Sequence, residues 1–151
     1  MIYLLDVNAL VAFGYAKHVH YPRVIDWLNT LRGNQRTWCL ATGAITELGF
    51  VRVATGPAGL ASSIEQACAD LKQLKEDQRV TFLGDALGAE WLPAWVRKSK
   101  QTTDGHLVQL ASAWGAVLAT LDTGIPGALL IPNLPHVSGV REPRLAYGVA
   151  A

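Results

Sequence analysis

Residues 2–10, IYLLDVNAL, form an apolar run interrupted by one acid, Asp6. Residues 2–7 predict a buried strand with Asp6 near its carboxyl end. Four later runs repeat this pattern between segments of helical period: 37–41, 80–83, 117–121 and 128–131. Apolar strands that alternate with helices predict an α/β protein, a three-layer α/β/α sandwich around a mostly parallel sheet.

Capping and periodicity signals place the helices between these strands. Pro22 and Gly33 bound the first helix. The capping box Ser62-x-x-Glu65 opens a later one. The other predicted helices are 43–53, a tryptophan-rich stretch over 87–95 bent at Pro93, and a segment that is capped by Thr102 or Thr103 and ends at Gly115.

A single domain over residues 1–151 accounts for the chain. A chain of this length buries roughly 70% of its unfolded-state surface, and half of its residues are hydrophobic, so its core needs no disulfides. Cys39 and Cys68 lack CxxC spacing and are expected to be buried thiols in a reducing compartment. No apolar run reaches the ~18 residues of a membrane span and no basic leader precedes Asp6, so we expect a cytoplasmic protein without membrane contact. An irregular ending is expected after Pro132.

Four acids interrupt or cap apolar segments: Asp6, Glu47, Asp104 and Asp122. Asp6 and Asp122 each follow a predicted strand, and the carboxyl ends of parallel strands meet at the sheet edge where ligands bind. Asp104 lies in the first turn of its helix, where the helix dipole favours the ionised form. Glu47 lies mid-helix on a stripe that leans towards the core. The four carboxylates are therefore expected to meet at one rim.

Each acid also has a plain structural interpretation. Asp6 and Asp122 suit turns or helix N-caps, Asp104 suits a helix start, and Glu47 suits a partly buried partner of Arg52. As a group they are hard to explain without a cation, because two unit charges about 4 Å apart repel by about 4 kcal/mol at an effective dielectric of about 20. An oxygen-only ligand set favours Mg²⁺, with Mn²⁺ as a substitute.

The net charge of +1 excludes nucleic-acid binding through bulk charge. Local positive charge occurs at Arg97, Lys98 and Lys100, just before the last predicted helix. Two interpretations stay open: a phosphate-binding patch, or a solvated helix end at which cations complement the dipole. His18 and His20 form an HxH in a polar loop, where a surface or structural role is expected rather than a metal site.

Four motifs occur in order along the chain: DVNAL, TELGFVRV, TTDGHLVQLA and ATLDTG. In order and spacing they resemble the PIN domain, in particular the VapC-type toxins of toxin–antitoxin operons, over about residues 1–131. The resemblance implies a metal-dependent endoribonuclease whose acidic quartet is the four acids above. It further implies an RNA substrate, a small antitoxin protein as partner, and a homodimer. Trp91 and Trp95, on one predicted helical face, are either an association surface or core.

Hydrolysis of a phosphodiester requires a nucleophile formed near neutral pH and neutralisation of transition-state charge, and Mg²⁺ supplies both. We expect Asp6 and Asp104 to be direct metal ligands. Glu47 and Asp122 are expected to bind a second metal or to hold the waters of the first, one of them accepting the proton of the attacking water.

Further polar residues are expected around this site. Asn8 follows the first acid closely and is expected to orient a carboxylate. Thr120 matches the hydroxyl residue that the resemblance places two positions before the last acid. Arg52 is expected either to contact an RNA phosphate or acidic partner, or to form a surface salt bridge. The expected substrate-binding residues are Asn8, Arg52, Arg97, Lys98 and Lys100.

Three other functions are weaker fits. A haloacid-dehalogenase-like phosphatase needs a second Asp where this chain has Asn8. A receiver domain needs a lysine at the end of a late strand, and none lies near Asp122. The main alternative is a catalytically silent PIN-like module that binds RNA or protein, although such a module would usually lack part of the acidic quartet.

Overall fold

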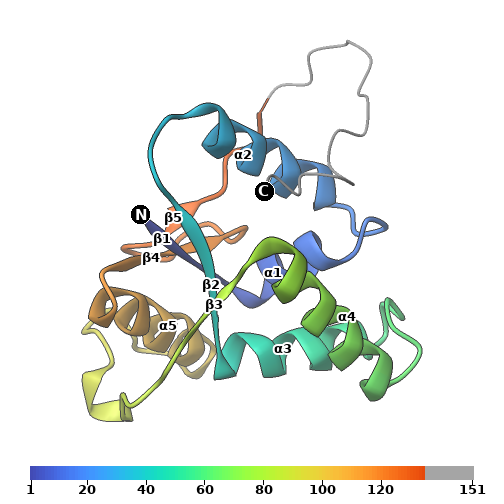
Figure 1. Ribbon diagram of the computed structural model, residues 1–151. Helices are drawn as coiled ribbons and strands as arrows, with labels where there is room; N and C mark the ends of the chain where they lie inside the picture. Colours follow the sequence, from blue (N-terminus) through green and yellow to red (C-terminus); the bar gives the residue numbers. More distant parts are fainter. Residues whose placement is uncertain (135–151) are drawn as a thin grey trace.

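The structure is a computed structural model that describes residues 1–134 (Figure 1). Its sheet has five parallel strands in the order β3-β2-β1-β4-β5. The strands are β1 (Ile2–Leu5), β2 (Cys39–Gly43), β3 (Thr81–Leu83), β4 (Ala116–Thr120) and β5 (Leu129–Leu130). The helices are α1 (Val7–Gly14), α2 (Tyr21–Gly33), α3 (Ala44–Ala54), α4 (Ile64–Gln78) and α5 (Thr102–Ala113), with 3-10 turns at Ala89–Trp91 and Ser99–Gln101. The predicted α/β/α architecture is confirmed.

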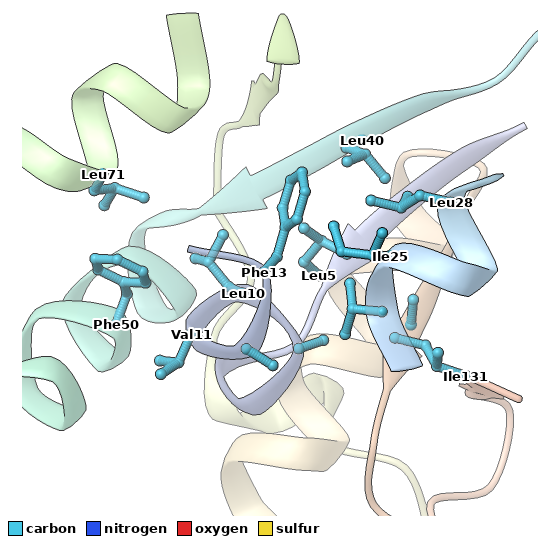
Figure 2. Close-up of a cluster of buried hydrophobic side chains, with 14 of the residues drawn as sticks. Leu5, Leu10, Val11, Phe13, Ile25, Leu28, Leu40, Phe50, Leu71 and Ile131 are labelled. Atoms are coloured by element: carbon cyan, nitrogen blue, oxygen red, sulfur yellow. The ribbon is translucent and has the colours of Figure 1, made fainter. Parts of the chain in front are cut away.

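Successive residues of the central strands face opposite layers of helices. Leu4 of β1 and Leu118 of β4 pack with Leu107 and other residues of α5. The next residues along each strand, among them Leu5, join a larger cluster with α1, α2, α3 and α4 (Figure 2). Burial of each such leucine stabilises the fold by about 1.5–3 kcal/mol, so the two clusters fix helices on both faces of the sheet.

The first strand is shorter than predicted, and the helix after it was not predicted. Strand β1 ends at Leu5, and the Asp6 carboxylate accepts a hydrogen bond from the Val7 N–H at 2.8 Å as the N-cap of α1. Helix α1 is buried from Ala9 to Phe13. The helix has only eight residues, most of them apolar, and periodicity alone does not separate so short an apolar run from a strand, which explains why the sequence pattern did not reveal it.

The predicted tryptophan-rich helix is wrong. Residues 84–98, called the strap below, contain only one 3-10 turn and run along α5. Side chains of α5 and the residue after it hold the strap: Trp114 Nε1 donates to the Gly84 carbonyl at 2.9 Å, and Gln109 Nε2 to the Trp91 carbonyl at 2.8 Å. Trp91 is 60% exposed, so the interpretation as core is wrong for it, whereas Trp95 is half-buried.

Smaller predictions also need correction. Ser63, not Ser62, caps α4 through the Gln66 N–H, and the two threonines expected to cap α5 lie inside it. Cys68 of α4 is exposed and Cys39 is half-buried, so the expectation of two buried thiols is wrong. The irregular ending that was predicted after Pro132 falls mostly on residues 135–151, which lie outside the described residues. Within residues 1–134, no helix combines the length and apolar composition that a membrane crossing needs.

Candidate active site

Asp6 lies at the junction of β1 and α1 and is only 5% exposed. Its two carboxylate oxygens accept hydrogen bonds from different elements: Oδ1 from the Val7 N–H at 2.8 Å and Oδ2 from the Thr120 hydroxyl at 2.7 Å. Its own backbone N–H donates to the Ala119 carbonyl at 2.9 Å, which extends the ladder between β1 and β4. The Asp6 side chain is therefore fixed in one orientation at the carboxyl edge of the sheet.

Thr120 and Asn8 join the end of β4 to this junction. The buried Thr120 hydroxyl donates to Asp6 and accepts a hydrogen bond from the Asp122 N–H at 3.1 Å. Asn8 Oδ1 accepts from the Leu121 N–H at 3.2 Å. These bonds place Asp122 at the same edge as Asp6, as the sequence predicted from the two strand ends.

Three aspartates share one electrostatic environment. Burial raises the pKa of Asp6, hydrogen bonds from Thr120 and Val7 oppose this rise, and the charge of Asp122 adds to it. Burial also raises the pKa of Asp104, and the charges of Asp6 and Asp122 raise it further. Because the charges of Asp6 and Asp122 make ionisation of Asp104 harder, a positive charge placed among them would be favoured.

Asp104 is half-buried in the first turn of α5, where the sequence placed it. The next residue, Gly105, is buried beneath the strap. A Cβ atom at Gly105 would lie 2.3 Å from Val96 Cγ2 and 3.2 Å from Pro93 Cδ. Glycine therefore allows the strap to cross the start of α5 directly beside Asp104.

Glu47 is held by a different set of contacts from those of the three aspartates. It lies in the first turn of α3, not mid-helix, because the helix begins at Ala44. Its Oε1 accepts hydrogen bonds from the Thr42 hydroxyl at 2.7 Å and from Lys75 Nζ at 2.5 Å. The interpretation of Glu47 as a partner of Arg52 is wrong, since the cation beside it is Lys75.

Sequence reasoning missed both partners of Glu47. Thr42 lies one residue beyond the predicted strand 37–41 and inside the observed β2, which ends at Gly43, and a hydroxyl so close to a strand end was a usable signal. Lys75 gave no signal, because it is one of several charged residues on α4 and lies 28 positions from Glu47 in sequence.

The donor set fits a hard divalent cation in its chemistry. Among residues 1–134, no three His, Cys, Asp or Glu side chains converge as a ready-formed metal cluster. Asp6, Asp104 and Asp122 nevertheless offer only oxygen donors, and two of them have a pKa raised partly by their neighbours' charges. Mg²⁺ and Mn²⁺ prefer such oxygen ligands. The assignment of individual ligands stays a prediction.

The cationic group near Asp104 is exposed. The backbone N–H groups of Arg97 and Lys98 donate to Gln101 Oε1 at 2.9 and 3.0 Å, and Lys100 lies in the 3-10 turn that leads into α5. All three cations therefore come before the N-terminus of α5, where the helix dipole disfavours positive charge. The dipole part of the solvated-helix-end interpretation is therefore wrong, although the three side chains are exposed as that interpretation expected, and a role in phosphate binding stays a prediction.

The remaining candidates lie outside this group. Arg52 is exposed in the last turn of α3, and no acid among residues 1–134 forms an ion pair with it. His18 Nδ1 accepts a hydrogen bond from the His20 N–H at 3.0 Å, which makes the HxH a local turn. Burial, and then the neighbouring His20, lower the pKa of His18.

A groove of about 730 Å³ lies along the surface where α3 and α4 pack side by side (Figure 1). Its walls are mostly apolar and include Leu48, 72% exposed, Val51 and Phe82, 49% exposed. Glu47 and Lys75 also line it. The groove therefore connects exposed apolar surface with the edge of the candidate site.

No protein-family model matches the chain. Ribonuclease VapC38 of Mycobacterium tuberculosis is 38% identical over 128 residues, which cover 81% of this chain and 86% of that protein. Ribonuclease VapC29 of the same organism is 32% identical over 139 residues, covering 88% and 98%. Ribonuclease VapC39, also from that organism, is 32% identical over 131 residues, covering 83% and 91%.

Two solved structures share the fold. The crystal structure of VapBC2 from Rickettsia felis, bound to a DNA fragment from its promoter, contains a chain that superposes with a TM-score of 0.55 at 19% identity, covering 85% of this chain and 96% of that one. PAE2754 from Pyrobaculum aerophilum superposes with a TM-score of 0.52 at 22% identity, covering 85% and 88%. At these identities the likeness concerns the fold alone. The sequence relatives, whose length this chain largely covers, show that the chain belongs to the VapC family of PIN-domain ribonucleases, the toxins of toxin–antitoxin systems.

Proposed function

We propose that this chain is a metal-dependent endoribonuclease that hydrolyses RNA phosphodiesters with Mg²⁺, or with Mn²⁺ in its place. The observation that carries the proposal is the position of Asp6, Asp104 and Asp122 at the carboxyl edge of the sheet, where the charges of Asp6 and Asp122 both act on Asp104. Membership of the VapC ribonuclease family supplies the substrate class. A silent RNA- or protein-binding module is the alternative.

In this proposal Asp6 and Asp104 hold the cation. Bound Mg²⁺ supplies a nucleophile from water near neutral pH and neutralises charge on the phosphoryl group. The Thr120 hydroxyl keeps the Asp6 carboxylate oriented, and burial of Asp6 strengthens its interaction with any cation. Asp122 is exposed and free of a basic partner among residues 1–134, so it is better placed than the Lys75-bound Glu47 to accept a proton from the attacking water.

RNA binding in this proposal uses groups around that edge. Arg97, Lys98 and Lys100 are exposed directly before the helix of Asp104, which suits contacts to phosphates on one side of the cleaved bond. Asn8 uses its carbonyl oxygen on the Leu121 N–H, which leaves its amide group to donate to RNA or to a carboxylate. Arg52, on α3, is a more distant candidate.

Divalent metal should stabilise the folded chain and should be required for RNA cleavage. Ligand binding to the native state adds about 2.7 kcal/mol at a metal concentration 100 times Kd. We expect the unfolding midpoint to rise with millimolar MgCl₂ or MnCl₂ in calorimetric scans. We expect the Asp104→Asn variant to respond much less, and EDTA to stop cleavage of a labelled RNA by the parent chain.

The Asp77→Asn variant is the matched control for this experiment. Asp77 is exposed on α4 and bonds to Gln73 of the same helix, so its loss should leave the metal response intact. Identical midpoints for the parent chain with and without metal, together with cleavage unaffected by EDTA, would favour the silent module or a contaminating nuclease over our proposal.

The cationic group should contribute to RNA binding through phosphate contacts. Replacing Arg97, Lys98 and Lys100 with Ser should weaken binding and reduce the slope of log K against log salt by up to about three phosphate contacts. The measurement is a salt titration on an Asp104→Asn background, which suppresses cleavage. The Lys98→Arg/Lys100→Arg variant keeps the charge and should keep the slope. An unchanged slope in the serine variant would remove these residues from the RNA path.

A protein partner is part of the same proposal. The Rickettsia felis relative in fold is a VapBC2 assembly, and we propose that a small antitoxin inhibits this chain by covering the acidic edge. The apolar groove beside Leu48 and Phe82 supports such a partner, because exposed apolar surface of this kind marks association sites. A homodimer, with the exposed Trp91 as one candidate contact, and a cytoplasmic location complete the proposal.

A further inference from the structure

Lys75 crosses from α4 to α3 and contacts one of the four acids. Its Nζ lies 2.5 Å from Glu47 Oε1, and the side chains of Lys75 and Glu47 are only 26% and 22% exposed. The Thr42 hydroxyl donates to the same Oε1 at 2.7 Å. Oε1 of Glu47 therefore already accepts two hydrogen bonds, whereas Oε2 accepts none among residues 1–134, so it is the charge of Lys75 that opposes a cation at Glu47.

Further contacts keep the Lys75 ammonium in place. It lies 5.4 Å from the centroid of the Phe82 ring, a geometry in which the ring face attracts a cation. Lys75 also belongs to the last turn of α4, where the helix dipole favours positive charge. Since the edge strand, the end of α4 and Glu47 all favour this position, the ammonium is a built-in cation beside the candidate site.

This fixed charge bears on how many metal ions the site can hold. One divalent cation among Asp6, Asp104 and Asp122, with Glu47 neutralised by Lys75, leaves a single net negative charge. A second divalent cation at Glu47 would have to displace the Lys75 ammonium or approach it closely, and like charges at such distances repel strongly.

We propose that Lys75 is a positioning residue that holds Glu47 away from metal coordination and limits the site to one divalent cation. This inference rests on the proposed function, because it presupposes a cation at the three aspartates. The inference concerns the ion pair between Lys75 of α4 and Glu47 of α3. It assigns Glu47 a role outside metal coordination, unlike the three aspartates.

Titration calorimetry of Mn²⁺ into the metal-free full-length chain tests the inference. We expect about one Mn²⁺ per parent chain and about two in Lys75→Met, which keeps the apolar stem but removes the competing charge. Lys75→Arg should remain at one. Lys72→Met is the matched control, because Lys72 lines the same groove one turn earlier on α4 and does not contact Glu47.

The double variant Lys75→Met/Glu47→Gln identifies the ligand of the second cation. It should return to one Mn²⁺, because the released carboxylate is then missing. Two Mn²⁺ ions in the parent chain would overturn the inference, and so would a Lys75→Met titration that matches Lys72→Met. In either case, metal-dependent cleavage by the parent chain would still support the proposed function. A parent chain that neither binds Mn²⁺ nor cleaves RNA would overturn both.

Discussion

Replacement of Asp6 by Asn should reduce RNA cleavage by at least about 100-fold. Even mutation of a residue that only orients a metal ligand lowers metal affinity or activity by about 10–100-fold. Asparagine keeps the size of the side chain and one oxygen that can accept from Val7 or Thr120, but it removes the charge that a cation requires. In cells that lack the antitoxin, the variant should no longer arrest growth. Cleavage of a labelled RNA and colony counts after induction measure the two effects.

The same substitution separates a functional role of Asp6 from a structural one. The pKa of Asp6 is raised in the folded state, so the native protein binds more protons than the unfolded chain between the ordinary Asp value, about 3.9, and the raised value. Ionisation of Asp6 therefore lowers the stability of the metal-free parent as pH rises through that window. Asp6→Asn should lack this loss and should be at least as stable as the parent at neutral pH.

Unfolding scans of metal-free protein at pH 4 and pH 7 test this expectation, with Asp77→Asn as the control for loss of one carboxylate. A fall of many degrees in the midpoint of Asp6→Asn at pH 7 would identify Asp6 as a structural cap of α1. Growth arrest equal to that of the parent would contradict the catalytic assignment directly.

Replacement of Gly105 by Ala should impair both stability and cleavage. The new Cβ would lie 2.3 Å from Val96 Cγ2, and Pro93 limits how far the strap can move away. Overpacking of this kind costs about 1–3 kcal/mol, and the higher helix propensity of alanine offsets about 1 kcal/mol of it. Because Asp104 is the preceding residue of α5, a shift of about 1 Å there could cost about 100-fold in cleavage.

Two companion variants show whether the strap is the cause. Gly33→Ala places a Cβ at the end of α2 where no atom lies within 4 Å, so it should stabilise the chain by about 0.5–1 kcal/mol. Val96→Ala in the Gly105→Ala background removes the closest clashing atom and should restore part of both losses. A Gly105→Ala chain with parental stability and cleavage would show that the strap accommodates the methyl group.

The fold was accessible from sequence because its signals are local. Apolar runs, Pro22, Gly33 and strand-end acids such as Asp6 and Asp122 follow from the period of one element and its caps. Since parallel strands end at the same edge, strand order was not needed to predict that these two acids lie at one edge, whereas the pairing of β1 with β4 is what brings them near each other. Helix α1 was missed because it spans only eight mostly apolar residues, and periodicity alone does not separate such a short run from a strand.

The tertiary structure determined which charged side chains form ion pairs. Glu47 could have paired with Arg52 on its own helix, yet Lys75 of α4 reaches it, because α3 and α4 pack against each other and bring together residues 28 positions apart. Trp91 is exposed for a related reason, since α5 holds the strap there through the Trp91 backbone carbonyl, whereas the apolar contacts with α5 are made by Leu87 and Val96. The sequence pattern thus determined the edge of the sheet at which the acids lie, whereas packing between elements determined which side chains pair with them. The residues that a side chain contacts across a helix interface produce no periodic pattern in the sequence.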